Sequence, residues 1–277
     1  MTSVLEPHLP PFNNDAAFVR TQPPNPEYKF GDRLSATEEG RRWLEGEKMG
    51  WKTFDTSKES AKDLYPLLLS GVYPRPVAFV SSVTEDGVEN LAPFSYFNTV
   101  SAHPPTISIS VNTTSVAEKD TSRNIKVDRA TKGFTVNIIS EAWVQQANAA
   151  CMNCPKDVSE WAISGLTKEP SIHVKAPRVR ESAFSMECEL QQVVELTPES
   201  TPGVPSTYLI LGAVKYLHVR KDVLNPNKNV ADPDKLKAIA RMGDISYTRI
   251  TEGFRLARFD WDKEAPNLQH LLNASSM

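Results

Sequence analysis

The sequence lacks long apolar runs, has few cysteines and carries little excess charge of either sign. No segment reaches the roughly eighteen consecutive apolar residues of a membrane-spanning helix, and the first residues lack the basic region and apolar stretch of a secretory signal. Three cysteines are too few for a disulfide framework in 277 residues and fit a reducing compartment. A net charge of −3 gives no general attraction to nucleic acid. We therefore expect a cytoplasmic protein that binds neither membranes nor nucleic acid.

Signals for a metal centre or a nucleophilic catalytic centre are equally scarce. The five histidines show no metal-ligand spacing, and no G-x-S-x-G occurs. Cys151 and Cys154 have the CxxC spacing of metal and redox sites, yet a zinc ion needs two further ligands and only His173 follows within about thirty residues. The ligand count therefore favours structural or incidental cysteines over a redox or metal role. We predict no metal ligand and no catalytic side chain.

The chain divides into three parts by composition. Residues 1–62 hold a proline-rich, extended arm and a helix expected over residues 37–47, with Trp43 on its buried side. Residues 63–250 form a body dominated by strand patterns, and residues 251–277 form a C-terminal tail. Because hydrophobic residues make up 40% of the chain, such a body can fold without disulfides or metal.

Period-two alternation and β-branched residues predict strands along the body. The pair Asp86-Gly87 marks a hairpin after the first strand. Few helices separate the strands, and parallel strands would need a crossover at each step. We therefore predict a mainly β, α+β fold built on an antiparallel barrel with a few peripheral helices. Strands are expected over residues 77–83, 106–112, 134–139, 184–196 and 208–219, and helices over 120–129, 141–150 and 233–241.

The first stretch with chemical content is Asn90–Asn98, which holds a proline, a hydroxyl, amides and three aromatic rings. Pro93 breaks strand regularity and frees neighbouring N–H groups to face a ligand. A flat heteroaromatic ring needs apolar faces and a few fixed donors along its polar edge, which this stretch could supply. The alternative is an aromatic-rich core strand with a bulge, and composition alone favours it.

The second stretch, Ser115–Ile125, places a lysine, hydroxyls and an arginine around an expected helix start. Helix N-termini present unpaired N–H groups and partial positive charge, so they suit a phosphate. Lys119 would add a point charge and Thr121 a hydroxyl donor, while Asp120 or Thr121 is expected as the helix cap. The alternative, favoured for such a pattern in isolation, is a capped surface helix. No glycine-rich run precedes Lys119, which excludes a Walker loop.

Further short motifs accompany these two stretches in a fixed order along residues 73–250. The set comprises Pro74–Ala78, Asn90–Asn98, Ser101–Val111, Lys119–Ile125, Gly133–Ser140, Glu160-Trp161, Gly165-Leu166, Pro177–Val179, Met186–Cys188, Leu211–Val214 and Leu236–Tyr247. Each motif is weak alone, but the ordered set resembles the flavin-reductase-like FMN-binding proteins, which include the reductase components of nitrilotriacetate monooxygenase.

The resemblance implies a split β-barrel that binds FMN near the interface of a homodimer. By position, the isoalloxazine ring is expected along Ala92, Pro93, Phe94, Ser95 and Phe97 with Ser110 beside it, the phosphate at Lys119, Asp120 and Thr121, and Arg241 and Tyr247 close to the same pocket. Arg75 is a further phosphate candidate, with a surface turn residue as an equal alternative.

The implied activity is that of a flavin-dependent oxidoreductase, which reduces flavin with NAD(P)H and passes electrons to O₂, a partner monooxygenase or another acceptor. Many reductases of this superfamily carry a histidine in a Gly-Asp-His turn, where this chain has Gly203–Tyr208 without histidine. The use of NAD(P)H is therefore left open. Two alternatives also stay open: an FMN-bound enzyme that acts directly on an organic substrate, and a non-catalytic flavin-binding protein.

Overall fold

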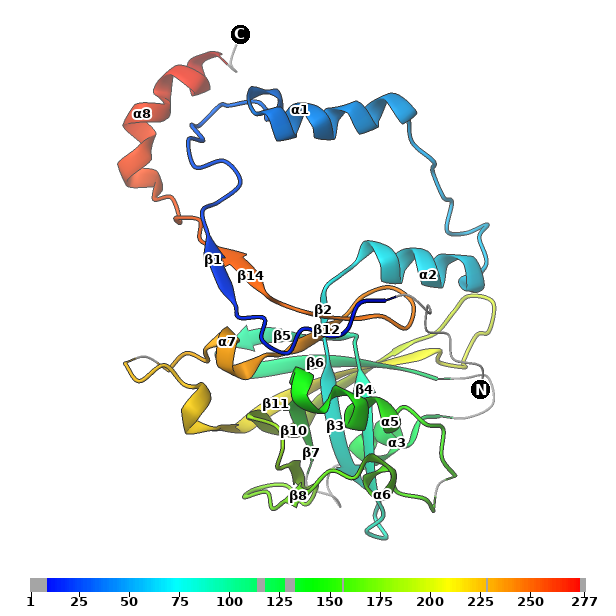
Figure 1. The fold of residues 1–277 in the computed structure, drawn as a ribbon. Coiled ribbons are helices and arrows are strands. Elements are labelled where there is room, and N and C mark those ends of the chain that lie inside the picture. The colour runs from blue at the N-terminus through cyan, green and yellow to red at the C-terminus, as the bar shows by residue number, and fades with distance from the viewer. Residues whose placement is uncertain (1–8, 114–117, 128–132, 156, 228, 275–277) are drawn as a thin grey trace. The chain divides into compact units, whose positions relative to one another are not determined.

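A seven-stranded antiparallel sheet forms the main body of the protein (Figure 1). The structure is a computed structural model that describes residues 9–113, 118–127, 133–155, 157–227 and 229–274. It divides into a larger unit, Tyr65–Ile250, and a smaller unit made of residues up to Leu64 and from Thr251 onward. The sheet belongs to the larger unit, and its antiparallel pairing confirms the predicted α+β class.

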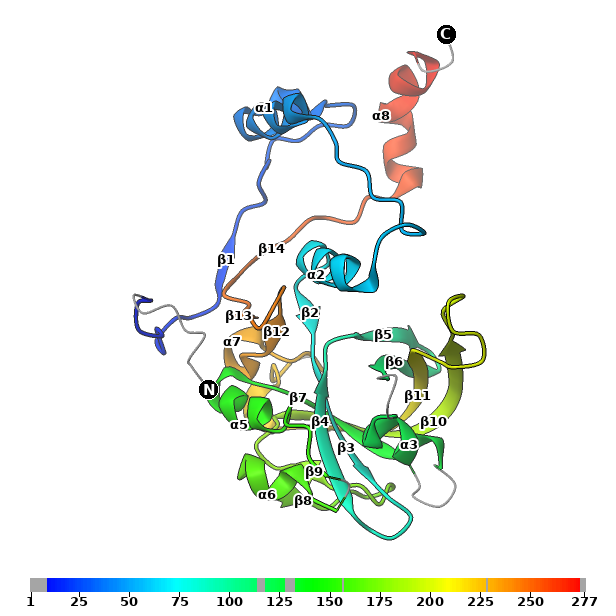
Figure 2. The ribbon, with the colours of Figure 1, turned by 90° about the vertical axis from the view of Figure 1, so that its right-hand side faces the viewer.

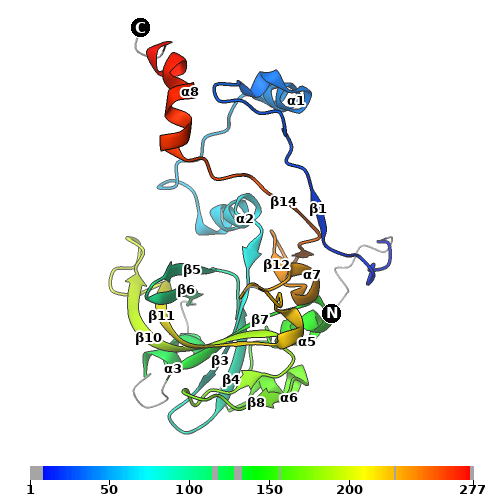
Figure 3. The ribbon, with the colours of Figure 1, turned by 90° about the vertical axis from the view of Figure 1, so that its left-hand side faces the viewer.

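The strands follow the order β4-β3-β7-β10-β11-β6-β5 across this sheet, and Figures 2 and 3 show how the sheet curves. Because neighbours in this order are often distant in sequence, the sheet joins segments from most of the larger unit. Its strands are β3 (Ala78–Val83), β4 (Glu89–Phe94), β5 (Phe97–Ala102), β6 (Pro105–Asn112), β7 (Phe134–Ile138), β10 (Phe184–Leu196) and β11 (Thr207–Val219).

The sheet buries both of its faces, as β3 shows. Successive side chains of a strand point to opposite faces. Ala78 and Val80 belong to one hydrophobic cluster, while Phe79 and the preceding Val77 belong to another. Since all four are less than 5% exposed, side chains on both faces of this part of the sheet are buried. Full burial of a ring such as that of Phe79 contributes about 1.5–3 kcal/mol relative to exposure.

Short helices complete the two clusters. Helix α3 (Asp120–Lys126) contributes Ile125 to the first cluster. Helices α5 (Val144–Ala149) and α6 (Glu160–Ser164) lie against the second, where Trp161 is buried. None of these three helices is long enough to be stable alone, so each depends on packing its apolar side chains against the sheet.

Two predicted helices differ in the structure. The N-cap of α3 is Lys119, without a side-chain capping bond, so Asp120 and Thr121 are not caps; positions 128 and 129 of the predicted helix lie outside the described residues. The helix predicted over 233–241 ends early. Helix α7 (Pro233–Leu236) stops at Lys237, whose φ of 47° is left-handed. Strand β12 (Ile239–Arg241) follows because its backbone pairs with neighbouring strands.

Helix α2 (Ala61–Gly71) was not predicted, and Pro66 lies inside it. Proline removes one backbone donor and usually ends a helix. The helix nevertheless continues to residue 71, and Leu69 is its buried side chain. The strands that pair beside it are β2 (Arg75–Pro76), β12 and β13 (Tyr247–Arg249), which form a separate three-stranded sheet.

The smaller unit contains helices and one pair of short strands. Helix α1 (Glu38–Glu45) confirms the predicted helix, but Trp43 is 75% exposed, so its predicted burial is wrong. Gly40 is the buried residue of α1, and it lies so close to the Leu34 carbonyl that a Cβ at this position would be 1.8 Å from the carbonyl oxygen. Strand β1 pairs in parallel with β14, and helix α8 lies within the segment expected to be a tail. These elements span Val19–Thr21, Glu252–Phe254 and Trp261–Ala274.

Several short elements complete the fold. They are η1 (Leu34–Ala36), η2 (Gly46–Met49), η3 (Glu141–Trp143), β8 (Lys168–Glu169), β9 (Arg178–Val179) and η4 (Lys221–Val223).

Among the described residues, no helix combines the length and apolar character needed to cross a membrane.

Candidate functional site

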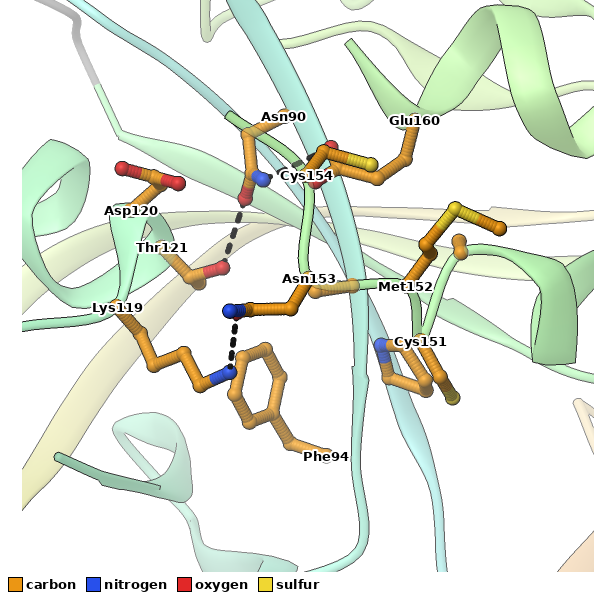
Figure 4. A pocket seen from close by; sticks show the side chains of 13 residues that line it. Asn90, Phe94, Lys119, Asp120, Thr121, Cys151, Met152, Asn153, Cys154 and Glu160 are labelled. Atoms are coloured by element: carbon orange, nitrogen blue, oxygen red, sulfur yellow. Dashed lines mark hydrogen bonds between the residues drawn. The ribbon is translucent and has the colours of Figure 1, made fainter. Parts of the chain in front are cut away.

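A pocket of about 150 Å³ lies where β4, the start of α3 and the loop between α5 and α6 meet (Figure 4). It brings together two stretches that the sequence analysis singled out separately. Six of the predicted site residues line it: Ala92, Pro93, Phe94, Lys119, Asp120 and Thr121. The other five, Ser95, Phe97, Ser110, Arg241 and Tyr247, are not among its lining residues.

Strand β4 forms the apolar wall of the pocket. It lies at the end of the strand order, so β3 is its partner in the sheet. On its other edge the Leu91 N–H donates to Glu160 and the Glu89 carbonyl accepts from Ser159, while Ala92, Pro93 and Phe94 line the pocket. An edge strand tolerates a proline because the missing N–H breaks no ladder bond. The ladder with β3 runs through Pro93 without a register shift, so the predicted break in strand regularity is not seen. The wall contributes the Pro93 and Phe94 rings, which give the apolar contact that a flat heterocycle requires.

The charged side of the pocket is built by the start of α3. The exposed Lys119 ammonium lies 3.3 Å from the amide oxygen of Asn153 across the pocket. The neighbouring carboxylate of Asp120 is paired with Arg123 at 2.6 Å, which compensates its negative charge. Lys119 is thereby left as a cation whose charge an anionic ligand can use, and no side chain caps the first turn of the helix.

Thr121 is placed differently from the free hydroxyl donor that the sequence suggested. It is only 2% exposed, and its Oγ1 donates a 2.8 Å hydrogen bond to Oδ1 of Asn90. The hydroxyl is therefore committed to the wall of the pocket. This hydrogen bond joins α3 to β4, in addition to any contact that Thr121 makes with a ligand.

Two polar residues of the pocket, Asn90 and Glu160, were not predicted as site residues. Both were part of quoted motifs, but no local signal gave them a role. The Glu160 carboxylate is 5% exposed and accepts hydrogen bonds from Asn90 Nδ2 and the Leu91 backbone N–H. Burial raises the pKa of Glu160, and the charge of Asp120 adds to that rise, whereas the donors oppose it.

Cys151 and Cys154 both line the pocket, and both are free thiols. Figure 4 shows the Cys154 side chain toward Glu160 and the Cys151 side chain pointing elsewhere. Burial raises the pKa of both thiols, and the nearby charge of Glu160 adds to the effect at Cys154. Within the described residues, no group of three His, Cys, Asp or Glu side chains could hold a metal ion.

The predicted residues outside the lining fall into two places. Ser110 donates its backbone N–H to the Tyr96 carbonyl, so it adjoins the Ser95–Phe97 turn. Arg241 and Tyr247 are cross-strand partners in the smaller sheet, with the guanidinium 4.5 Å from the ring centre.

The hydroxyl of Tyr247 reaches toward the pocket through α5. It donates a 3.0 Å bond to Asn148, whose backbone carbonyl accepts from Cys151, a lining residue. Burial raises the pKa of the Tyr247 hydroxyl, so it stays protonated at neutral pH. Arg241 and Tyr247 therefore adjoin the pocket without lining it.

Arg75 fits neither of the roles considered for it. The side chain is 6% exposed, which excludes a surface turn. Its guanidinium donates to the backbone carbonyls of Leu69, Val72 and Met242, at 2.6 to 2.7 Å. Most of its donors are thus used within the protein, and it joins α2 to the turn before β13.

The described lining suits a ligand that combines a flat ring with an anionic group. The Pro93 and Phe94 rings of β4 offer apolar contact, and Lys119 offers a positive charge in the lining of the same pocket. The acidic groups nearby are either paired, as Asp120 is with Arg123, or buried with donors, as Glu160 is. The pocket therefore accommodates negative charge on its Lys119 side.

Comparison with known families agrees with this chemistry. A family model described as the flavin reductase like domain matches residues 69–239. The uncharacterized protein YwrF of Bacillus subtilis is 35% identical over 205 residues, which cover 74% of this chain and 98% of that protein. An uncharacterized protein of Aquifex aeolicus is 38% identical over 194 residues, covering 69% and 93% of the two chains.

Solved structures show the same fold. Nitrilotriacetate monooxygenase component B from Bacillus cereus aligns with a TM-score of 0.70 and 36% identity, over 75% of this chain and 99% of that chain. A Shewanella frigidimarina protein, described as a flavin reductase with a split barrel domain, aligns with a TM-score of 0.60 and 19% identity, over 76% and 99% of the two chains. The second likeness bears on the fold alone, and it identifies the curved sheet as a split barrel.

Proposed function

The chain belongs to the flavin reductase-like family and is a flavin-dependent oxidoreductase, and we propose that it binds FMN in the pocket beside β4 and reduces it with NAD(P)H. The observation that carries the proposal is the meeting of Lys119 with the Pro93 and Phe94 wall in one pocket. In the sequence these two features are separate and individually weak. That both line one pocket supports a single ligand with a ring and a phosphate.

The residues have distinct roles in this proposal. The β4 wall holds one side of the ring and keeps water from it. Lys119 neutralises the phosphate, helped by the uncapped first turn of α3. Ser95 directly follows β4, Phe97 begins β5 and Ser110 lies in β6, and in this proposal the rest of the ring extends toward them. FMN, when bound, supplies the two-electron redox chemistry, so no protein side chain needs to act as nucleophile.

The domain division follows the same proposal. Residues 63–250 form the FMN-binding split barrel, which encloses the family match over residues 69–239. Residues 1–62 and 251–277 are additions outside the match. For the electron acceptor, the resemblance to a monooxygenase component favours a separate monooxygenase that consumes reduced flavin.

An anaerobic absorption spectrum tests the function directly. We expect purified protein loaded with FMN to show two visible flavin bands, which bleach on addition of NADPH or NADH and return in air. Heat-denatured protein with the same FMN is the control for free flavin.

Each other outcome points to a different activity. Flavin bands that persist with both nicotinamides would contradict the reductase role and favour direct action on an organic substrate or a binding role. Protein that retains no flavin after gel filtration, even when loaded with FMN, would contradict cofactor binding itself.

The homodimer is supported by the outer face of α2. Tyr65 and Leu68 lie on one side of this helix at helical spacing, Val72 directly follows the helix, and each is more than half exposed. Leu67, next to them, is 43% exposed. A contiguous apolar face of this kind is typical of a surface that a second copy covers.

Replacing Leu68 with Glu should therefore convert the dimer to a monomer. An unpaired charge in an apolar interface costs several kcal/mol, so we expect the dimer dissociation constant to rise at least about 30-fold. Light scattering after gel filtration measures the mass. Lys221→Glu, at an exposed position of η4, is the control and should stay dimeric. A wild-type protein that is monomeric at tens of micromolar would overturn the dimer proposal.

A further inference from the structure

A buried chain of hydrogen bonds connects α6 to α3 behind the pocket (Figure 4). Glu160 Oε2 accepts from Asn90 Nδ2 at 2.9 Å, and Asn90 Oδ1 accepts from Thr121 Oγ1 at 2.8 Å. The three side chains are 5%, 8% and 2% exposed. Each comes from a different element, since Asn90 lies on β4. The chain of bonds therefore links three walls of the pocket.

Glu160 sets the direction of this chain. An ionised carboxylate can only accept hydrogen bonds, so the amide of Asn90 must turn its Nδ2 toward Glu160. Its Oδ1 then faces Thr121 and accepts from the hydroxyl. Without the carboxylate, either end of the amide could face α6, and the Thr121 hydroxyl would lose its fixed partner. The backbone N–H of Leu91 also donates to Glu160, at 3.1 Å, and holds the carboxylate against β4.

A second branch holds α3 one turn further on. Asn124 Nδ2 donates to Ser82 Oγ at 3.1 Å, and Ser82 Oγ donates to Asn90 Oδ1 at 3.4 Å. Ser82 and Asn124 are at most 2% exposed. Two side chains of α3, three positions apart, thus end on the same amide oxygen. Buried networks whose members are all bonded rigidify the elements they join.

We propose that Glu160 is a positioning residue for the phosphate end of the site: through Asn90 it holds the first turn of α3, and with it Lys119, at a fixed distance from the β4 wall. The inference rests on the proposed FMN site. Glu160 touches neither ring nor phosphate in this account. It acts by orienting one amide, and the expected defect is confined to the part of the ligand that α3 contacts.

Flavins with and without a phosphate separate this role from general stabilisation. Riboflavin shares the ring of FMN but has no phosphate. We expect Glu160→Ala to weaken FMN binding by about ten-fold, the effect of losing one to two hydrogen bonds of this kind, and riboflavin binding by less than about two-fold. Glu160→Gln keeps an oxygen that can accept both bonds, so it should restore FMN affinity to within about three-fold of wild type. Fluorescence quenching of the flavins measures all affinities.

Two further variants complete the test. Ser159→Ala removes a neighbouring hydrogen bond, to the Glu89 carbonyl, outside the network, and should leave both affinities unchanged. Thr121→Val breaks the other end of the network with a side chain of the same shape. It should weaken FMN binding selectively, even if Glu160→Ala does not fold.

The outcomes distinguish the positioning role from the FMN site itself. Equal losses for FMN and riboflavin, unchanged FMN affinity in both Glu160→Ala and Thr121→Val, or a Gln variant as weak as the Ala variant would each overturn the positioning role. A wild-type protein that binds neither flavin would instead overturn the FMN site.

Discussion

Lys119→Ala is expected to weaken FMN binding by about 1–3 kcal/mol, or roughly 5- to 150-fold, because it removes a charge-assisted bond to the phosphate. The size follows from the surroundings of Lys119. The nearby guanidinium of Arg123 is already paired with Asp120. It therefore cannot replace the lost positive charge without leaving the Asp120 carboxylate unpaired. The Lys119 ammonium itself has only an amide oxygen, that of Asn153, as its described partner.

Equilibrium titration with FMN and with riboflavin measures the effect. Riboflavin affinity should stay within about two-fold of wild type, since riboflavin carries no phosphate. Raising the ionic strength should reduce the difference between wild type and variant for FMN, because an exposed charge pair is screened. Lys221→Ala changes the net charge equally at a distant exposed position and is the matched control. An unchanged FMN affinity in Lys119→Ala would show that the phosphate lies elsewhere.

Glu187→Ala should give the largest loss of stability, about 3–5 kcal/mol at pH 7. The Glu187 carboxylate is fully buried in β10, with no exposed surface. It accepts from the three backbone N–H groups of residues 172–174, at 2.6 to 3.1 Å, and from His218 at 2.7 Å. Removing it leaves the buried Val174 N–H and the part-buried donors of Ile172, His173 and His218 without this acceptor, and an unsatisfied buried donor costs more than its bond contributed.

Acid should remove the same stabilisation. Burial alone would raise the pKa of Glu187, but its four hydrogen bonds outweigh burial and lower the pKa below the ordinary 4.5. A carboxyl group whose pKa is lower in the folded state stabilises that state above the unfolded pKa. This contribution is lost as the pH falls through the lower, folded value. The difference in the free energy of unfolding between wild type and Glu187→Ala should therefore become smaller below about pH 4.5.

Urea unfolding followed by circular dichroism, at pH 7 and at pH 4 or below, measures both effects. Glu195→Ala, at an exposed position of the same strand, should change stability by less than about 0.5 kcal/mol. A Glu187→Ala variant within about 1 kcal/mol of wild type at pH 7 would contradict the structural role of the carboxylate.

The sequence was informative wherever structure depends on neighbours in the chain. The alternation in β10 and β11 predicted these strands almost to the residue, because side-chain direction repeats every two positions in a strand. The segment after Leu236 was predicted wrongly for the same local reason. Its helical composition gave no sign of a strand whose formation depends on pairing with β2 and β13.

The sequence by itself determined the barrel class, the family and the two stretches that meet at the pocket. Only the tertiary structure decided which polar side chains complete the pocket. Asn90 and Glu160 are 70 positions apart, and Arg75 meets the Met242 carbonyl across 167. Neither pair follows from a local pattern, since a hydrogen bond between distant residues exists only once packing has placed both partners within about 3 Å. The same packing turned Thr121 from a free donor into a buried link and left Lys119 facing the pocket.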